Sequence, residues 1–446
     1  MKSQKLLVRA NQHTQQIITC SITDQLLINF PVSVIFFYSK SINCNLLVEA
    51  LKKVLSDFPI FAGTLTNIDN NLCIDCNNQG VLFSVKKANL TLEQILHQPQ
   101  IIKTDKLINI VEPKKTISNQ SPVMIIKLTY LNCGGMALGV SWHHSIGDMH
   151  TFMCLMKAWS STVNKKEYDL PLIITERDKY LEANLENKDN ITPDVRYLSN
   201  KELVKLGVSL LFLAHNKIGL QIYFSEDELK NMKQDFLAKT KQNLSTNDVL
   251  CAYLFSIIAE LDFHEEAKKL SIAVNYRPRI NLPQNILGNF ISLMTVISNQ
   301  DLEPFQLAKS LRASVNNFQH QHLNLWATKK YIEQNGGRKK IARFISKSID
   351  PTTRNLLITN WAKSGVYEIT FGESKPIYFT PFGNPPFPWL SVIVEGFLNK
   401  GLIYSAVLPR KLAKKLMQED ILKKIHQYRE QEEVMPELIA QLRWLL

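Results

Sequence analysis

The feature that most constrains this chain is a strand–turn–helix unit at residues 136–163. Residues 136–142 are apolar or small, as in a buried strand, and the apolar residues after position 149 recur at a helical period, at Phe152, Leu155, Met156 and Trp159. Asp148 stands where that helix should begin, so its carboxylate can cap the first free N–H groups. His144 is left in the turn, where its side chain can face a cleft and accept a proton near neutral pH. The unit predicts a general base beside a structural acid.

The His-x-x-x-Asp spacing alone leaves function and coincidence open, because the chain has 10 histidines. No other histidine has an Asp four residues later. His143 should point away from His144 if both lie on a strand, since side chains alternate between the two faces. We therefore expect His143 to be a packed or solvated residue and His144 to be the base.

Length and composition indicate a soluble globular protein of two domains. The chain has 446 residues, of which 45% are hydrophobic and 21% charged. Its net charge of +12 is spread along the sequence and comes without a recognisable nucleic-acid-binding motif. A phosphate-bearing small molecule accounts for the basic excess as well as a nucleic acid does.

The seven cysteines show no disulfide framework, which favours reduced thiols in a cytoplasmic protein. Cys73 and Cys76 form a C-x-x-C pair, but residues three apart on a strand point to opposite faces, and no second pair completes a metal site. Residues 1–16 contain no signal-peptide core, and the apolar runs at 31–38 and 206–214 are too short to cross a bilayer. We expect no metal site and no transmembrane segment.

Strand and helix patterns alternate along both halves of the chain. In the first half they predict a strand at 32–38, a helix at 45–57 and a hairpin of 123–131 with 136–142. In the second half they predict strands at 219–224, 270–275, 290–297, 356–360, 390–395 and 402–408. Helices are expected from a Ser225–Glu228 capping box to about 238, then at 246–261, 304–318, 326–346 and 410–428. The resulting organisation is an α/β domain at 1–170, a crossover linker with at most a short helix at 171–215, and a second α/β domain at 216–428.

Residues 429–446 form a separate C-terminal segment. Met435, Leu438, Ile439 and Leu442 fall on one helical face, which predicts an amphipathic helix that docks on its own domain, self-associates or meets a membrane surface.

Several segments resemble the BAHD acyl-CoA-dependent acyltransferases. Residues 58–65 (FPIFAGTL) are similar to the family's YPLAGRL segment, and residues 287–290 (LGNF) to its FGN turn. Residues 20–27 are similar to the start of its first strand, and residues 367–376 align with its last landmark. These pieces occur in the family's order over about residues 5–425.

The resemblance implies two chloramphenicol-acetyltransferase-like domains, each a mixed sheet flanked by helices, with a substrate tunnel between them. Acyl-CoA would be a co-substrate, with no tightly bound cofactor, and a small-molecule alcohol or amine would be the acceptor. His144 would deprotonate the acceptor without a covalent acyl-enzyme. Asp148 would hold the turn, paired with Arg277 or Arg279, and these two arginines are also candidates for binding substrate or CoA. We expect a monomer, with self-association through 429–446 left open.

The sequence departs from the family pattern at two places. Met149 stands where the family has Gly after the Asp, and the family's DFGWG box is replaced by residues 370–374 (TFGES), which keep only Phe371 and Gly372. Thr370 implies a different bracing of the second domain. Glu373 would be a poor neighbour for an oxyanion, or else it points outward as a solvated charge.

Other candidate binding residues are less specific. Ser245 and Thr246 begin a predicted helix, where they could bind a phosphate or pantetheine group or simply cap the helix. Trp361 and Lys363 lie where the family often places acceptor contacts, and Lys363 could bind an acidic acceptor or be a solvated charge. Phe371 and Gly372, the two residues kept in the altered box, are further candidates for substrate binding. Residues 384–389 predict a rigid loop near the tunnel mouth.

Two other functions stay open on the sequence. A condensation-type enzyme would share an H-H-x-x-x-D-G box, which Met149 breaks. A non-catalytic relative that acts by binding ligand or protein is suggested by the altered box, whereas the intact His144 and Asp148 argue against it.

Overall fold

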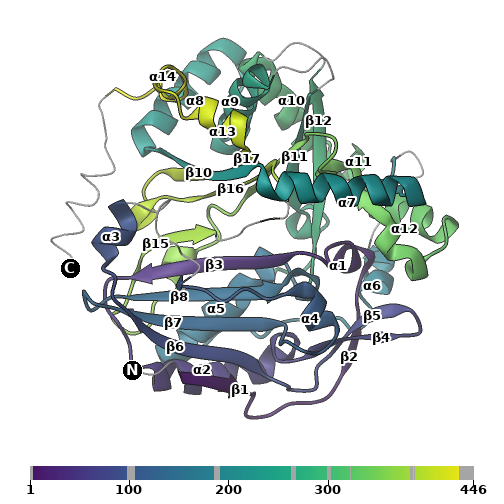
Figure 1. Cartoon of the computed structure of the whole chain (residues 1–446), viewed down its shortest axis with the longest axis vertical. Helices are drawn as coiled ribbons and strands as arrows, with labels where there is room; N and C mark the ends of the chain where they lie inside the picture. The colour runs from purple at the N-terminus through teal and green to yellow at the C-terminus, as the bar shows by residue number, and fades with distance from the viewer. Residues whose placement is uncertain are drawn as a thin grey trace.

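The structure is a computed structural model that describes residues 4–97, 106–184, 191–262, 268–298, 303–321, 323–381, 385 and 387–430. Two mixed open sheets lie one above the other and helices flank each of them (Figure 1). This arrangement confirms the predicted two-sheet α/β fold.

The first sheet carries His144 at the end of a central strand. Its six strands run in the order β1 (Gln4–Val8), β6 (Val81–Ala88), β7 (Met124–Leu131), β8 (Met136–His143), β3 (Pro31–Tyr38) and β15 (Pro376–Pro381). Strands β7 and β8 form the predicted antiparallel hairpin. Helices α2 (Cys44–Asp57) and α5 (Met149–Val163) pack together and bury their apolar residues in the same core.

The second sheet has the order β10 (Lys217–Phe224), β17 (Leu402–Pro409), β16 (Leu390–Glu395), β14 (Leu356–Asn360), β11 (Lys268–Asn275) and β12 (Ile291–Ser298). It is covered by α8 (Glu226–Thr240), α9 (Thr246–Leu261), α10 (Pro304–Asn316), α13 (Arg410–Leu416) and α14 (Glu419–Ile425). Helix α9 is the central one, with twelve of its residues buried.

Two smaller sheets and several short helices complete the described fold. The sheets are β2 (Ile17–Thr19), β5 (Asn71–Asp75) and β4 (Thr64–Ile68), and β13 (Phe344–Ser346) with β9 (Val195–Tyr197). The remaining α-helices are α1 (Ile22–Leu26), α3 (Leu92–His97), α4 (Pro113–Ile117), α6 (Arg177–Asn184), α7 (Asn200–His215), α11 (Phe318–Gln321) and α12 (Leu325–Gln334). The 3-10 turns are η1 (Pro59–Phe61), η3 (His144–Ile146), η4 (Arg277–Arg279), η5 (Arg338–Arg343), η6 (Lys347–Ile349), η7 (Val366–Glu368) and η8 (Phe397–Asn399).

One strand from the second half of the chain belongs to the first sheet. Strand β15 comes from the second half of the sequence but pairs with β3 in the first sheet. It is bounded by Pro376 and Pro381 and had not been predicted. Residues 376–381 thus belong to the first sheet. The domain boundaries expected at residues 170, 215 and 428 stay predictions.

Several predicted elements are wrong in extent. The expected helix at 326–346 ends at Gln334, because Gly336 and Gly337 adopt left-handed φ values of +109° and +68° that stop it. The expected helix at 410–428 is two short helices, α13 and α14. Residues 22–26 are a capped helix rather than the start of a strand.

The linker is more regular than expected, because α7 has 16 residues. Ser225 caps α8, but the Glu228 side chain binds His426 and Arg429 and does not complete a capping box. The predicted C-terminal helix lies, from residue 431, outside the described residues. Within the described part of the chain, the longest helices are too short or too polar to span a bilayer.

Candidate active site

The turn that carries His144 is fixed by hydrogen bonds on both sides. Strand β8 is paired with both β3 and β7, and the His144 N–H donates to the Phe30 carbonyl at 3.0 Å. The Trp142 indole N–H donates to the Gly147 carbonyl at 2.9 Å. The Ser145 hydroxyl donates to the Asp24 carbonyl at 2.7 Å. The sequence predicted this turn, and these bonds fix the backbone that carries His144.

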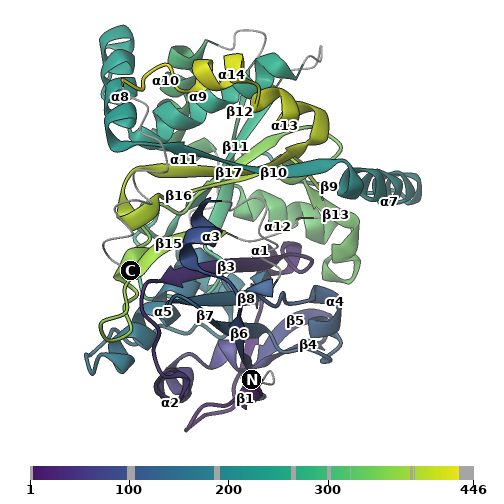
Figure 2. The same ribbon diagram turned by 60° about the vertical axis from the view of Figure 1, so that its left-hand side comes forward.

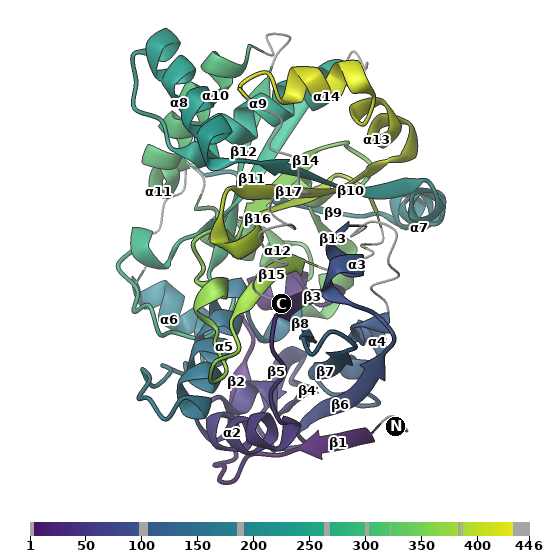
Figure 3. The same ribbon diagram turned by 90° about the vertical axis from the view of Figure 1, so that its left-hand side faces the viewer.

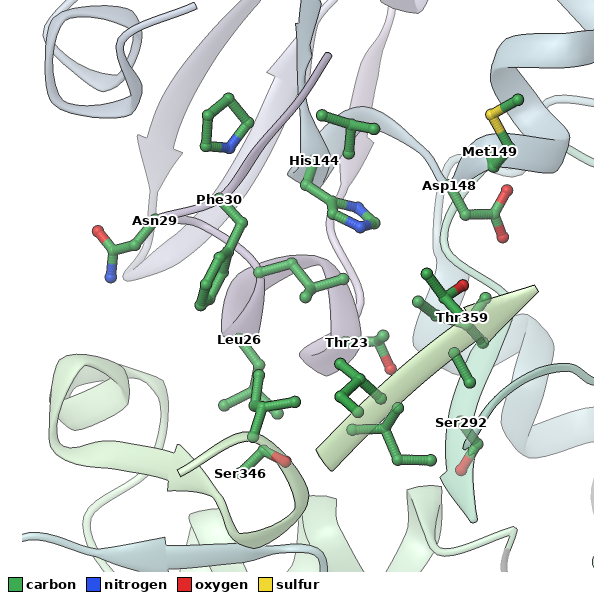
Figure 4. Close-up of a pocket in the computed structure, with 18 of the residues that line it drawn as sticks. Thr23, Leu26, Asn29, Phe30, His144, Asp148, Met149, Ser292, Ser346 and Thr359 are labelled. Carbon is green, nitrogen blue, oxygen red and sulfur yellow. The ribbon is translucent and has the colours of Figure 1, made fainter. Parts of the chain in front are cut away.

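His144 borders a cavity of about 1230 Å³. Thr23, Leu26 and Phe30 line it from the first half of the chain, and Ser292 and Thr359 from the second sheet (Figure 4). The His144 ring extends toward this space, whereas the Asp148 carboxylate stands to one side. The two halves thus enclose one cavity with an imidazole on its wall.

The tautomer of His144 follows from its neighbour Asn289. The Asn289 amide nitrogen donates to the His144 carbonyl at 2.7 Å and to Asp24 Oδ1 at 2.8 Å. Both N–H groups of the Asn289 amide are therefore used as donors. The Asn289 Oδ1, 3.0 Å from His144 Nδ1, must then accept a hydrogen bond from the ring N–H. Nδ1 of the neutral imidazole therefore carries the hydrogen, and Nε2 is left with a free lone pair.

The protonation of His144 is balanced by opposing effects. Burial lowers the pKa of His144 below its ordinary value, while the Asp148 charge and the bond to Asn289 act to raise it. The net shift is downward, so the ring is neutral at physiological pH. Burial lowers the pKa of the neighbouring His143 to about 4, and its Nδ1 accepts the Ser145 N–H. His143 is a packed residue, as predicted.

Asp148 also lines the cavity, but its carboxylate lies to one side of the His144 ring and holds the two halves together. It caps α5 by accepting the Thr151 N–H at 2.9 Å, and it accepts the Phe290 N–H at 3.0 Å. Arg277 pairs with both of its oxygens, at 2.8 and 3.2 Å, and both side chains are buried. Burial alone would raise the pKa of Asp148, but the Arg277 guanidinium and the hydrogen bonds outweigh burial and hold it below the usual value. The predicted division of labour between His144 and Asp148 matches this geometry.

Three other candidates lie away from the cavity wall. Arg279 donates to the Val315 carbonyl at 3.3 Å and lies over the Phe318 ring, so it is not the partner of Asp148. The Ser245 hydroxyl forms a reciprocal capping box with Asp248 and is occupied by its own helix. Neither Ser245 nor Thr246 is among the described residues that line the cavity. The capping role is observed, and a role in binding CoA stays a prediction.

The altered box at residues 370–374 is not at the cavity either. The Phe371 ring is buried against Trp159 and Tyr38, with ring centroids 5.2 and 5.7 Å apart. Gly372 adopts a left-handed φ of +63° and donates to Asn164. Glu373 points outward and pairs with exposed Lys40 at 3.0 Å. Of the residues that the structure describes, neither Phe371 nor Gly372 is among those that line the cavity. Both contact α5, and a role for them in binding substrate or CoA stays a prediction.

Thr370 has a bracing role in the first half of the molecule. Its carbonyl accepts from Ser160 at 2.7 Å and from Asn164 at 2.8 Å, both at the end of α5. These bonds join residue 370, from the second half of the chain, to the end of α5 in the first half.

Trp361 and Lys363 do line the cavity, as expected for substrate contacts. The Lys363 N–H donates to Glu395, which fixes the loop that carries both residues. Lys157 of α5 also lines the cavity and pairs with Glu368 at 3.6 Å. Phe387, from the loop predicted at 384–389, lines the cavity and packs edge-on against Phe30.

The sequence analysis missed the residues that orient His144. Asn289 lies 145 positions further along the chain, in the LGNF segment that served only as a family landmark. Asp24, which holds Asn289, is itself paired with buried Arg177 at 2.8 Å. A polar residue beside a glycine turn was the only signal in the sequence, and no pattern connects it to a histidine so far away.

Comparison with known proteins agrees with this geometry. The model of the Transferase family matches residues 1–419. Shikimate O-hydroxycinnamoyltransferase of Nicotiana tabacum is 25% identical over 425 residues, which cover 90% of this chain and 94% of the relative. Anthranilate N-benzoyltransferase protein 2 of Dianthus caryophyllus is 25% identical and covers 76% of each chain.

A solved structure shows the same fold. The TRI101 structure from F. sporotrichioides, complexed with coenzyme A and T-2, aligns with a TM-score of 0.71 at 18% identity, over 92% of this chain and 98% of that one. With the family model matching nearly the whole chain, this protein belongs to the Transferase family of BAHD acyltransferases, which move an acyl group from acyl-CoA to an alcohol or amine.

Proposed function

We propose that His144 is the general base of this acyltransferase and that it acts on an acceptor bound in the cavity. The observation that carries the proposal is the free Nε2 lone pair at the cavity wall, with Nδ1 held by Asn289. A histidine in this state can take a proton from a bound hydroxyl or amine. Asp148 is a positioning residue, because its carboxylate is occupied by Arg277 and by the α5 N-terminus.

The proposed reaction proceeds in one ternary complex. His144 Nε2 removes the acceptor proton while the acceptor oxygen or nitrogen attacks the thioester carbonyl. The tetrahedral intermediate collapses by breaking the C–S bond, and the CoA thiolate takes the proton back from the imidazolium. No acyl-enzyme forms. General-base assistance of this kind contributes about 10²–10⁴-fold to the rate, and holding both substrates in one cavity adds more.

The cavity lining supports a co-substrate with phosphates and an acyl group of substantial size. Lys157 and Lys363 lie on the wall and offer cationic partners for CoA phosphates. Leu26, Phe30, Met153 and Leu293 supply apolar surface. The hydroxycinnamoyl and benzoyl groups named for two relatives are bulky and aromatic, and the cavity volume has room for such groups.

We further propose that the enzyme works as a monomer in the cytoplasm, without a tightly bound cofactor. All seven cysteines are free, which suits a reducing compartment. The altered box was the main reason to consider a non-catalytic relative. Its place in the packing of α5, away from the cavity, weakens that reason.

The proposal is tested by following thiol release from CoA thioesters. The full chain would be incubated with acetyl, benzoyl and hydroxycinnamoyl-CoA, each with a set of alcohols and amines, and free CoA would be measured over time. The expected result is acceptor-dependent CoA release with at least one pair. CoA thioesters that stabilise the protein against heat without any release would instead support a binding protein.

A further inference from the structure

Helix α7 (Asn200–His215) presents an apolar face that no described residue covers. Val204, Val208, Leu211 and Phe212 are between 64% and 69% exposed, and they fall on one side of the helix at 3.6 residues per turn. No residue of α7 is buried. In Figures 2 and 3 the helix stands at the edge of the molecule. Large apolar side chains gathered in this way on a soluble domain mark an interaction surface.

The opposite side of α7 belongs to the cavity. Leu206 and Leu210 point the other way around the helix and line the cavity wall. Ile110, 38% exposed, lines the same cavity. The helix therefore separates the interior of the cavity from whatever contacts its outer face.

Basic groups lie on the outer side of α7 and at both of its ends. Lys201 and Lys205 are exposed and lie on the same side of the helix as Val208. Arg343 donates to Asn200 at the N-terminal end, at 2.8 Å, and Lys217 and Arg410 donate to the Ala214 and His215 carbonyls at the other end. The one acidic residue of α7, Glu202, is paired with Arg196. The surface combines exposed apolar side chains with positive charge.

We infer that α7 docks this enzyme onto an anionic lipid surface, with Val204, Val208, Leu211 and Phe212 inserted among the lipids. An amphipathic helix with lysines beside its apolar face binds at such an interface, through apolar burial and attraction to anionic headgroups. The inference goes beyond the proposed function, and it places one wall of the cavity beside the lipid.

A second copy of this chain fits the same face less well. Residues 204–212 extend about 12 Å along a helix about 10 Å wide, whereas a stable dimer buries about 800 Å² on each partner. The chain also carries a net charge of +12, so two basic faces would repel each other. An anionic surface complements that charge.

The experiment is flotation of the full chain with vesicles of phosphatidylcholine, alone or mixed with phosphatidylserine. We expect binding to the mixed vesicles that weakens as salt is raised. Leu211→Gln with Phe212→Gln should lower the partition coefficient by about tenfold or more, because two large apolar side chains are no longer buried. Lys201→Gln with Lys205→Gln should lower it by about fivefold per lysine on the anionic vesicles alone.

The matched control is Leu237→Gln on α8, where a leucine 50% exposed lies on another surface helix. It should leave vesicle binding unchanged, and thermal stability should be unchanged in all three variants. The inference is overturned if the unaltered chain floats with neither vesicle, or if Leu211→Gln with Phe212→Gln floats as the control does. It is also overturned if light scattering shows a dimer that this double substitution dissociates, because the face would then join two copies.

Discussion

At the residue scale, His144 is oriented by an amide and not by the carboxylate four positions away. The Asn289 Oδ1 accepts a hydrogen bond from His144 Nδ1. Its amide nitrogen donates one hydrogen bond to the His144 carbonyl and another to Asp24. Asp24 and Arg177 hold Asn289 from behind. An amide that cannot ionise fixes the tautomer without adding charge beside the base.

Replacing Asn289 should therefore impair the base without removing it. Asn289→Ala leaves the ring free to rotate and to exchange tautomers, so kcat should fall about tenfold or more while KM for acyl-CoA stays near its original value. Steady-state kinetics measures both. Asn285→Ala, which removes a bond from an exposed amide to the Leu170 carbonyl, is the matched control and should leave kcat unchanged. An unchanged kcat in Asn289→Ala would show that the bond has no catalytic role.

The pH dependence of the rate should report the lowered pKa of His144. The imidazole accepts a proton only when neutral, so kcat/KM should rise with pH through the pKa of the free enzyme. Because burial moves that pKa downward, the midpoint should lie below the ordinary histidine value of about 6.5. A pH–rate profile measures it, and an acidic limb centred above that value would contradict the assigned environment.

At the element scale, the Asp148–Arg277 pair connects the start of α5 to the turn η4, and so connects the two halves of the chain. Both side chains are buried, and each would be left as an uncompensated charge without the other. Thr151 and the Gly288 carbonyl share the same guanidinium. The pair is thus the centre of a small polar network at the domain junction.

Breaking this pair should be far more costly than removing its neighbour. Arg277→Met leaves Asp148 buried and unpaired, so the free energy of unfolding should fall by about 3–5 kcal/mol. Arg279→Met removes a half-buried arginine bound to one carbonyl and should cost about 1 kcal/mol. Denaturant unfolding of both variants measures the difference. An equal decrease in the free energy of unfolding in both variants would show that the Asp148–Arg277 pair stabilises the fold no more than the Arg279 contact does.

The same pair should make stability depend on pH. The folded state holds the pKa of Asp148 below its unfolded value, so its contribution is present above the unfolded pKa of about 3.9 and is lost as the pH falls toward the folded pKa. In Arg277→Met this source of acid sensitivity should be missing. Unfolding curves of the unaltered chain and of Arg277→Met, measured between neutral pH and pH 3, compare how the free energy of unfolding depends on pH.

Helices and strands whose residues form a periodic or apolar run with clear ends were predicted from the sequence. Helix α9, strand β14 and strand β16 have their expected bounds, because each is a periodic or apolar run with clear ends. Helix α12 is shorter than predicted, since the pair Gly336–Gly337 ends it. Strand β15 was missed because prolines at both ends and aromatic residues between them give no alternation, and its partner lies more than 300 residues away.

At the scale of the whole molecule, the altered box contacts the end of α5, and we expect it to affect packing and not chemistry. Residues 370–374 run past the end of α5, with Phe371 in the core and Glu373 outside. Phe371→Ala should lower the free energy of unfolding by about 3–5 kcal/mol, since a large buried ring is lost. Glu373→Gln should change neither stability nor kcat. Thermal melts and steady-state rates test both, and a large loss of kcat in Glu373→Gln would place the box at the active site after all.

The family resemblance predicted the fold, which depends on the order of the landmarks, and it led us to expect the roles of His144 and Asp148, which stay predictions. It did not predict that Phe371 and Gly372 lie outside the cavity, since chain order does not say which side of a helix a later loop passes. Asn289 was missed for a related reason: its role depends on a contact between two turns that only the folded chain brings together.

The central claim, that His144 is the base of an acyl-CoA-dependent transfer, is tested most directly by CoA release from His144→Ala. His150→Ala is the matched control, because its imidazole also lines the cavity but Nε2 is held 2.6 Å from the Gln284 carbonyl. We predict that His144→Ala loses about 10²–10⁴-fold in kcat with unchanged thermal stability and acyl-CoA affinity, whereas His150→Ala loses far less. Turnover at the original rate in His144→Ala would contradict the mechanism.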